Sequence, residues 1–354
     1  IDYKIQQYRL FKQLANAYAL KFTGRWMIEQ VGLLEGKNVG IIKNTELLKE
    51  LAATSAGLKS LCTIMATNGI EDCRKCCGGN GYLLNSGIGA MACDYLWQIT
   101  AEGDFIILGL MTGKHLIKSI GKLLGGNHTQ GVIEYLNVLA KKDFNLVSIR
   151  PQPARNESDY LCVEYLQSFF NYRAIERLYN VTQDINKLMK GGMKFDDAVN
   201  EYSNEVLKAT HSHCYLIIFN NFVAKLKEMK DPATNKVLHK LCILFALCNF
   251  LDENWGDLIQ GDQFRMIKNV VYQVMSEVRP DSVALVDAFD FPDHVLKTTI
   301  GRYDGNVYEA LFDAGQKSVL NRQDPFEGYE KVLKPHLNKE LLKRGNKPVL
   351  NGKF

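Results

Sequence analysis

The chain has 354 residues, a length at which two domains are more common than one. Hydrophobic residues make up 46% of it and charged residues 23%, a balance that is typical of globular proteins and excludes a globally disordered chain. The 43 basic and 39 acidic residues give a net charge of +4 without forming a basic block of the kind that binds a phosphate backbone. We therefore expect no nucleic-acid partner.

The apolar runs and the cysteines limit the cellular setting. The longest apolar run, residues 241–251, is well short of the roughly 18 residues that a membrane-spanning helix needs, so no membrane span is predicted. Nine cysteines are an odd number, and they are crowded only at Cys73, Cys76 and Cys77, which favours a reducing compartment over a disulfide framework. The sequence starts at Ile1 within a helical pattern, and we interpret it as the later part of a longer polypeptide.

Periodic apolar residues predict helices along most of the chain, and in the first helix Phe11, Ala15, Tyr18, Phe22 and Trp26 share one face. The predicted segments are 11–26, 45–68, 104–121, 132–140, 160–190, 195–228, 236–251, 261–278 and a helix from about 306. Glycines 32, 36 and 40 mark a loop after the first helix. No segment alternates polar and apolar residues as a half-buried strand would, so the predicted class is all-α.

The segment 150–156 has the composition of a linker because Pro151 and Pro153 oppose both helix and sheet. We place a domain boundary there. The prediction is two packed helical bundles, one over residues 1–149 and the other over residues 150–354.

A glycine-rich loop at residues 77–82 is the first candidate for a functional site. Gly78, Gly79 and Gly81 surround Asn80, and without Cβ atoms their backbone can approach a phosphate or a ring edge closely. The loop does not have the spacing of a nucleotide-binding G-x-G-x-x-G motif, and no strand precedes it. From the pattern alone, a tight turn between two helices remains the simpler interpretation.

Glu102 is the second candidate, about twenty residues further along the chain. It lies between an apolar, aromatic segment and a helix that is predicted to begin at Asp104. A carboxylate just ahead of a helix N-terminus is favoured as the anion, and a substrate that excluded water would make it a stronger base. A surface acid that only caps the helix fits the same pattern, and the pattern does not separate the two.

Other motifs do not predict a catalytic or metal centre. His211 and His213 are two residues apart, so their side chains point in different directions on a helix. The Cys73-x-x-Cys76 pair has no second pair of ligands at a suitable spacing, and buried helix cysteines explain it better. The nucleophile motif G-x-S-x-G is absent from the sequence. We predict no metal site.

Several segments together resemble the peroxisomal acyl-CoA oxidase family, in order and over nearly the whole chain. The most specific match is the last one, because so many residues at fixed positions do not arise from helical composition. The matching segments are residues 2–11, residues 69–74 leading into the glycine loop 77–82, the turn 100–104, and residues 279–291 followed by 301–308.

The resemblance implies the C-terminal, all-helical half of such an oxidase, without the N-terminal helical domain and the β-domain. It implies FAD as cofactor and acyl-CoA and O2 as substrates, with a trans-2-enoyl-CoA and hydrogen peroxide as products. Glu102 matches the family's glutamate base. Gly78, Gly79, Asn80 and Gly81 match its flavin loop. Asp104 stands where a second acid follows the Glu-Gly pair, and we expect it to contact the cofactor as well. We also expect a homodimer or an assembly with the missing half.

The chain departs from the family pattern at positions that face the flavin in the family. Phe105, Ile106 and Met111 replace polar residues, and Asn80 stands where a histidine is common, so hydrogen-bonding capacity is reduced. A non-catalytic structural subunit that kept the fold and lost the cofactor is therefore the alternative to an oxidase. The family is peroxisomal, but the chain ends in residues 351–354, Asn-Gly-Lys-Phe, rather than in a Ser-Lys-Leu type signal, so another organelle such as the mitochondrion stays open.

Overall fold

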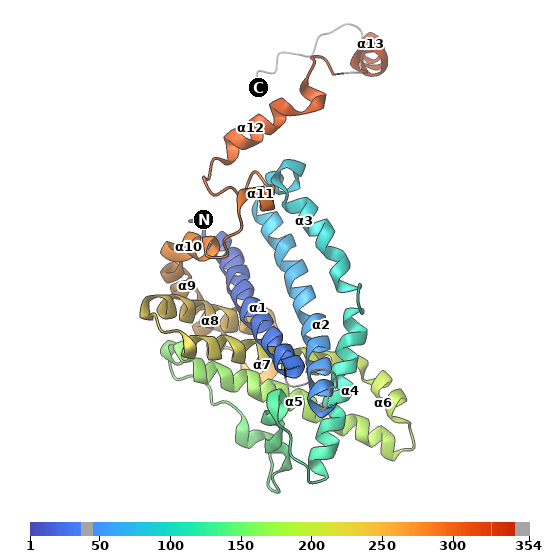
Figure 1. The fold of residues 1–354 in the computed structure, drawn as a ribbon, viewed down its shortest axis with the longest axis vertical. Helices are drawn as coiled ribbons and strands as arrows, with labels where there is room; N and C mark the ends of the chain where they lie inside the picture. Colours follow the sequence, from blue (N-terminus) through green and yellow to red (C-terminus); the bar gives the residue numbers. More distant parts are fainter. Residues whose placement is uncertain (37–44, 327, 344–354) are drawn as a thin grey trace. The chain divides into compact units, whose positions relative to one another are not determined.

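The structure, a computed structural model, describes residues 1–36, 45–326 and 328–343. In these ranges the regular elements are helices and none is a strand, which confirms the all-α prediction (Figure 1). None of the helices in these ranges is both long and apolar enough to cross a membrane. The α-helices are α1 Lys4–Gly36, α2 Thr45–Cys76, α3 Ile88–Tyr95, α4 Phe105–Leu124, α5 Val163–Lys190, α6 Phe195–Glu201, α7 Ser203–Glu228, α8 Pro232–Asp252, α9 Asp262–Val278, α10 Ser282–Asp287, α11 Asp293–Leu296, α12 Val307–Lys317 and α13 Lys334–Lys343.

The chain forms two compact units, each of which is described here by itself. The larger unit contains residues 1–78 and 90–290, and the smaller one contains residues 79–89 and the chain from Phe291. Helices from both sides of the Pro151-x-Pro153 segment belong to the larger unit. The division into bundles 1–149 and 150–354 therefore stays a prediction.

The main core of the larger unit forms where α1 packs against α2, α7 and α8. The predicted apolar face of α1 is buried, since Phe11, Ala15, Tyr18 and Phe22 are each at most 9% exposed. Trp26, the fifth residue of that face, is partly buried against the same core. Burying one large apolar side chain stabilises a fold by about 1.5–3 kcal/mol, so this face fixes α1 on its three partners.

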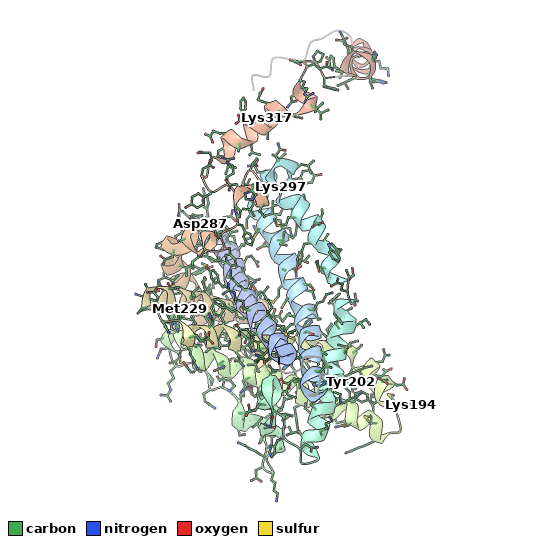
Figure 2. All side chains as sticks on the ribbon, viewed as in Figure 1. Lys194, Tyr202, Met229, Asp287, Lys297 and Lys317 are labelled. Carbon is green, nitrogen blue, oxygen red and sulfur yellow. The ribbon has the colours of Figure 1, made fainter. Side chains whose placement is uncertain are left out.

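A second apolar cluster lies among α4, α5, α6, α7 and the 3₁₀ helix Gly131–Ala140. Its members include Leu116 and Ile120 from α4 and Leu178 from α5. Lys194 and Tyr202, both labelled in Figure 2, flank the short helix α6. The predicted segment 195–228 is thus two helices, with the break at Tyr202.

Small residues let α2, α4 and α7 approach one another closely. A Cβ atom at Gly109 of α4 would lie 2.4 Å from Leu207 Cδ1 of α7 and 3.0 Å from Ser60 Oγ of α2. One turn later, a Cβ atom at Gly113 would lie 2.3 Å from a methyl carbon of Val206. The Oγ1 atom of Thr210 donates a hydrogen bond to the Gly109 carbonyl at 3.0 Å. These contacts fix the N-terminal half of α4, and with it the turn that precedes the helix.

One local prediction is wrong. Gly32 and Gly36 do not mark a loop but lie within α1, which continues to Gly36. A helix tolerates an isolated glycine at a cost of about 1 kcal/mol, so these glycines do not by themselves end α1. Gly40, the third glycine of the predicted loop, lies outside the described residues.

Candidate active-site turn and glycine loop

Glu102 lies in a turn whose backbone has an unusual conformation. Its φ is 54° and that of Gly103 is 109°, so both residues lie on the left-handed side of the backbone map. A residue other than glycine adopts such a φ rarely, and the strain costs about 1–3 kcal/mol unless the surroundings enforce it. The turn follows the 3₁₀ helix Leu96–Ile99, and the Glu102 side chain is exposed. Strained residues of this kind gather at functional sites, so the geometry makes Glu102 a candidate.

Lys59 of α2 holds this turn in place. Its ammonium group donates a hydrogen bond to the Ile99 carbonyl at 3.1 Å and a short one to the Gly103 carbonyl. The two carbonyls lie on either side of Glu102 in the chain, so one cation joins both ends of the turn. Charge-assisted hydrogen bonds are about twice as strong as neutral ones. This contact gives a physical reason for the backbone strain at Glu102 to persist.

Asp104 caps helix α4. Its Oδ1 atom accepts hydrogen bonds from the backbone N–H groups of Ile106 at 2.9 Å and Ile107 at 3.3 Å. The start of a helix at this acid, which the sequence predicts, is confirmed because α4 begins at Phe105. An N-cap of this type contributes about 1 kcal/mol to the helix. The predicted contact of Asp104 with a cofactor stays a prediction.

Ser60, next to Lys59 on α2, connects the start of α4 to α7. Its hydroxyl donates to the Phe105 carbonyl at 2.6 Å, and its Oγ atom lies 2.9 Å from Nε2 of His211. Ser60 is fully buried, so these two partners satisfy a hydroxyl that has no access to water. The chain of contacts from α7 through Ser60 to Phe105 fixes the orientation of the first turn of α4.

The first turns of α4 present apolar side chains to solvent. Ile106 is 42% exposed, Ile107 63% and Met111 45%, while Phe105 is half-buried. Trp97, in the 3₁₀ helix before the turn, is 51% exposed. Grouped apolar exposure of this kind marks surfaces that another group covers. Ile106 and Met111, two of the positions where the chain departs from the family pattern, are thus accessible apolar side chains in the first turns after the Glu102 turn.

The glycine loop is a 3₁₀ turn over Gly78–Tyr82 that follows α2 directly. Gly78 has a φ of 58°, and a Cβ atom at Gly78 or Gly79 would meet no atom within 4 Å. Asn80 is exposed, whereas Gly81 is buried. The backbone of the first three residues is therefore open to a ligand. The fourth, Gly81, packs closely, since a Cβ atom at Gly89 would lie 3.3 Å from its carbonyl oxygen.

The segment that follows the glycine loop is fixed by a distant part of the sequence within the smaller unit. The backbone N–H and the hydroxyl of Thr299 both donate to the Asn85 carbonyl, at 3.1 Å and 2.8 Å. The Thr298 hydroxyl donates to the Ser86 carbonyl. Gly87 has a φ of 74°, and a Cβ atom there would lie 2.9 Å from Cβ of Thr298. The resemblance covers residues on both sides of this contact, 77–82 and 301–308.

The two candidate pieces belong to different compact units. Gly79, Asn80 and Gly81 are in the smaller unit, whereas Glu102 and Asp104 are in the larger one. Gly78 is the last residue of the first segment of the larger unit. Each piece is therefore characterised by its own contacts.

The cysteines and histidines named in the sequence have inert surroundings. Burial raises the pKa of the Cys73 thiol to about 11, so it stays protonated at neutral pH. Burial, with a smaller effect from His115, lowers the pKa of His213 to about 3. The neutral ring of His213 lies 2.8 Å from the Tyr135 hydroxyl through Nδ1. Over the described ranges, no group of three or more His, Cys, Asp or Glu side chains is arranged to hold a metal ion.

Lys59 and Ser60 are the positioning residues that the sequence analysis misses. They lie between Leu58 and Leu61, two core residues of α2, and Lys59 is a charged residue among apolar and small ones. That interruption is the one signal in the sequence that could have pointed to them. Their partners are about 40 to 150 residues away, which no local pattern indicates.

Family models match most of the chain. The model described as "Acyl-CoA oxidase, C-alpha1 domain" matches residues 1–117, and the model described as "Acyl-CoA oxidase" matches residues 162–338. The peroxisomal acyl-coenzyme A oxidase 1 of Rattus norvegicus is 34% identical over 339 residues, which are 95% of this chain and 51% of the relative. The chain thus spans about half the length of the curated relatives it matches.

Solved structures agree with the sequence comparison. Acyl-CoA oxidase 1 of Arabidopsis thaliana superimposes with a TM-score of 0.86 at 33% identity, covering 96% of this chain and 51% of that one. Acyl-CoA oxidase-2 of Caenorhabditis elegans, solved with FAD, ascaroside-CoA and ATP, gives a TM-score of 0.85 at 30% identity, covering 96% of this chain and 50% of that one. The helical fold described above is therefore similar to one half of these proteins.

Proposed function

The chain belongs to the acyl-CoA oxidase family, and we propose that it supplies the catalytic base and part of the flavin site of such an oxidase. The reaction we propose is the α,β-dehydrogenation of an acyl-CoA to a trans-2-enoyl-CoA, with reduction of O2 to H2O2. In this proposal the carboxylate of Glu102 removes the α-proton of the thioester.

The observation that carries the proposal is the turn at Glu102, whose backbone is strained and is held in place by Lys59. The α-proton of a thioester is only weakly acidic, so its base must be positioned accurately and shielded from water. Lys59 fixes the carbonyls on both sides of Glu102. The carboxylate of Glu102 forms no ion pair with the described residues. An exposed, unpaired carboxylate on a fixed backbone suits a base that the substrate covers on binding.

The glycine loop fits a bound flavin. A Cβ atom at Gly78 or Gly79 would meet no atom within 4 Å, so a ligand can approach the backbone there. Asn80 adds an exposed side-chain amide that can both donate and accept hydrogen bonds. FAD, when bound, supplies the acceptor for the hydride that leaves the β-carbon and passes the electrons to O2. We propose that Gly78, Gly79, Asn80 and Gly81 contact this cofactor, and that Asp104 is a further cofactor-binding residue.

The remaining walls of the site are expected to come from outside this chain. Since the chain spans about half of its relatives' length, the acyl-CoA and most of the flavin would contact the other half. The apolar side chains of Ile106, Ile107 and Met111, which solvent reaches in this structure, are suited to exclude water around Glu102 once they are covered. We further propose that the protein acts as a homodimer or as an assembly that includes that half.

The alternative is a structural subunit that kept the fold without the chemistry. Phe105, Ile106 and Met111 favour it, because none of these side chains can form a hydrogen bond with a flavin. The visible absorption spectrum of the purified full-length protein separates the two functions. The oxidase has flavin absorbance and produces H2O2 when an acyl-CoA is added, whereas a colourless protein that is held in a larger complex and produces no H2O2 would establish the structural subunit.

The relatives named above suggest where the protein acts. They are named peroxisomal oxidases, so we propose a peroxisomal location. Residues 351–354, which the sequence analysis compares with an import signal, lie outside the described residues. Fluorescence of the tagged full-length protein should coincide with a peroxisomal marker. Coincidence with a mitochondrial marker would contradict this location without affecting the assignment of Glu102.

A further inference from the structure

A polar cavity lies in the larger unit. Its volume is about 270 Å³, and its walls come from α1, α2, α5, α7 and α8. Lys12, Arg173, Arg177 and Lys208 supply basic groups to its lining. Neither Glu102 nor any residue of the glycine loop lines it. The family resemblance and the proposed function do not account for a cavity with this lining.

Arg173 on α5 is the central residue of this cavity. Its side chain is 4% exposed, and one nitrogen, Nη2, donates to Glu253 Oε2 and to the Asn254 carbonyl, each at 3.2 Å. The guanidinium also lies over the Trp255 ring, 4.1 Å from its centre. The Nε and Nη1 atoms are buried and have no hydrogen-bond partner in the described part of the chain. Buried polar groups are normally paired, so these N–H groups indicate a missing acceptor.

Arg177, one helical turn further along α5, adds a second cation to the same wall. Its Nη1 atom donates to Ser212 Oγ at 3.0 Å, and its Nη2 atom donates to the Asn254 carbonyl at 3.3 Å. Burial and the neighbouring charge of Arg177 lower the pKa of Arg173 to about 10. Two guanidinium groups that repel each other at the edge of a cavity would both be stabilised by an anion between them.

The acidic side chains that line the cavity do not neutralise all of its positive charge. Asp252 lies 2.5 Å from Lys12 Nζ and accepts a hydrogen bond from the Tyr8 hydroxyl at 3.0 Å, so it is already paired. Glu253 interacts with Arg173 and is itself 43% exposed. Lys208 and Arg177 have no carboxylate partner within hydrogen-bonding distance among the described residues. The cavity therefore has an excess of positive charge.

We propose that this cavity binds the phosphate group of a small anion. Guanidinium groups recognise phosphate through charged N–H donors, and Arg173 has two buried donors without a partner, Nε and Nη1, which lie on opposite sides of its planar guanidinium group. Asn249 also lines the cavity, and its buried Oδ1 atom has no donor in the described residues. A phosphate that carries a proton supplies that donor, whereas a carboxylate or sulfate at neutral pH does not. The combination of unpaired donors and an unpaired acceptor favours phosphate.

Calorimetric titration of the full-length protein with inorganic phosphate tests the site. We expect saturable binding, weaker binding of sulfate because sulfate offers no proton to Asn249, and no binding of chloride at the same ionic strength. A second titration with glycerol 3-phosphate, made at about pH 6 so that a large fraction of the ester keeps a proton for Asn249, shows the source of the group. If the ester binds as well as inorganic phosphate, the ligand class is a phosphorylated metabolite, and if only inorganic phosphate binds, the class is the free anion.

Two substitutions and a matched control connect the binding to the cavity. Arg177→Met should weaken phosphate binding roughly tenfold or more, because it removes a charged hydrogen-bond donor. Lys208→Met changes an exposed residue of the lining and should weaken binding by about two- to fivefold without affecting folding. Lys187→Met is the control, because Lys187 lies on α5 but is exposed and pairs with Asp184 outside the cavity.

Three results would overturn the proposal. They are the absence of phosphate binding at millimolar concentration, equal weakening by Lys208→Met and Lys187→Met, and equal binding of phosphate and chloride. If Arg177→Met fails to fold, Lys208→Met and its control still decide the outcome. Failure of this site leaves the proposed oxidase unaffected, because H2O2 production depends on Glu102 and not on the cavity.

Discussion

The Glu102 turn and the glycine loop are built on opposite principles. At Glu102 a strained backbone is held by Lys59 and Ser60 from α2, and only the carboxylate side chain is left exposed. At Gly78 and Gly79 no atom lies within 4 Å of the missing side chains, and it is the backbone itself that is exposed. A side chain that transfers a proton needs a fixed backbone beneath it, whereas a backbone that contacts a flat cofactor needs open space around it. Substitutions in the Glu102 turn and in the glycine loop should therefore change different measured quantities.

Among changes to the residues that hold the turn or form the loop, removal of the Lys59 ammonium group should have the largest effect. In Lys59→Met the carbonyls of Ile99 and Gly103 lose their shared donor, the turn relaxes, and Glu102 moves from its position. A displacement of about 1 Å can cost roughly a hundredfold in rate, so kcat should fall by up to about that factor while flavin absorbance stays. Lys190→Met, which changes an exposed lysine at the end of α5, should leave kcat unchanged. A kcat for Lys59→Met equal to that of the control would show that the turn does not need this contact.

The same substitution made at two glycines compares the two regions directly. In Gly103→Ala the new Cβ atom meets the Leu108 side chain at 2.8 Å at a φ of 109°, so the free energy of unfolding should fall by about 1–3 kcal/mol. In Gly79→Ala the Cβ atom enters open space, and stability should change by less than about 0.5 kcal/mol.

Flavin affinity should respond in the opposite order. Gly79→Ala should release FAD more readily than Gly103→Ala, because its new methyl group stands where the cofactor is proposed to lie. Chemical denaturation and flavin release by dilution measure the two effects separately. Equal losses of stability at both glycines would remove the distinction between a held turn and an open loop.

Asp104 allows a smaller, more local test. Asp104→Ala removes the acceptor for the N–H groups of Ile106 and Ile107 and should lower the free energy of unfolding by about 1 kcal/mol. Asp104→Asn keeps an N-cap oxygen and should recover most of that loss, since asparagine caps helices about as well as aspartate. Thermal unfolding of the two variants gives the comparison. If both variants lose the same stability, the charge of Asp104 matters more than its capping hydrogen bonds.

The sequence shows the parts of this arrangement that depend on local chemistry. The apolar face of α1 and the start of a helix after Asp104 follow from spacing and from capping preferences, and the structure has both. The all-α class follows from the lack of alternation along the chain.

The features that depend on distant contacts could not be read from the sequence. Lys59 reaches carbonyls 40 and 44 residues away, and the positive φ of Glu102 depends on that contact. In the sequence, Arg173 has the pattern of a surface residue on an amphipathic helix. Its burial depends on the contact with Trp255, which is distant in the sequence. Gly32 and Gly36 mislead because a helix tolerates isolated glycines, and α1 continues through Gly32 to Gly36.

The most direct test of the central claim is the rate at which an acyl-CoA bleaches the flavin of Glu102→Gln in the absence of O2. Glutamine keeps the size of the side chain but cannot accept the α-proton, and loss of a general base costs about 10²–10⁴ in rate. We predict a decrease within that range in the full-length protein with its flavin bound, while Glu134→Gln, a change at an exposed glutamate, bleaches as fast as the wild type. Bleaching of Glu102→Gln at the wild-type rate would contradict the assignment of Glu102 as the base.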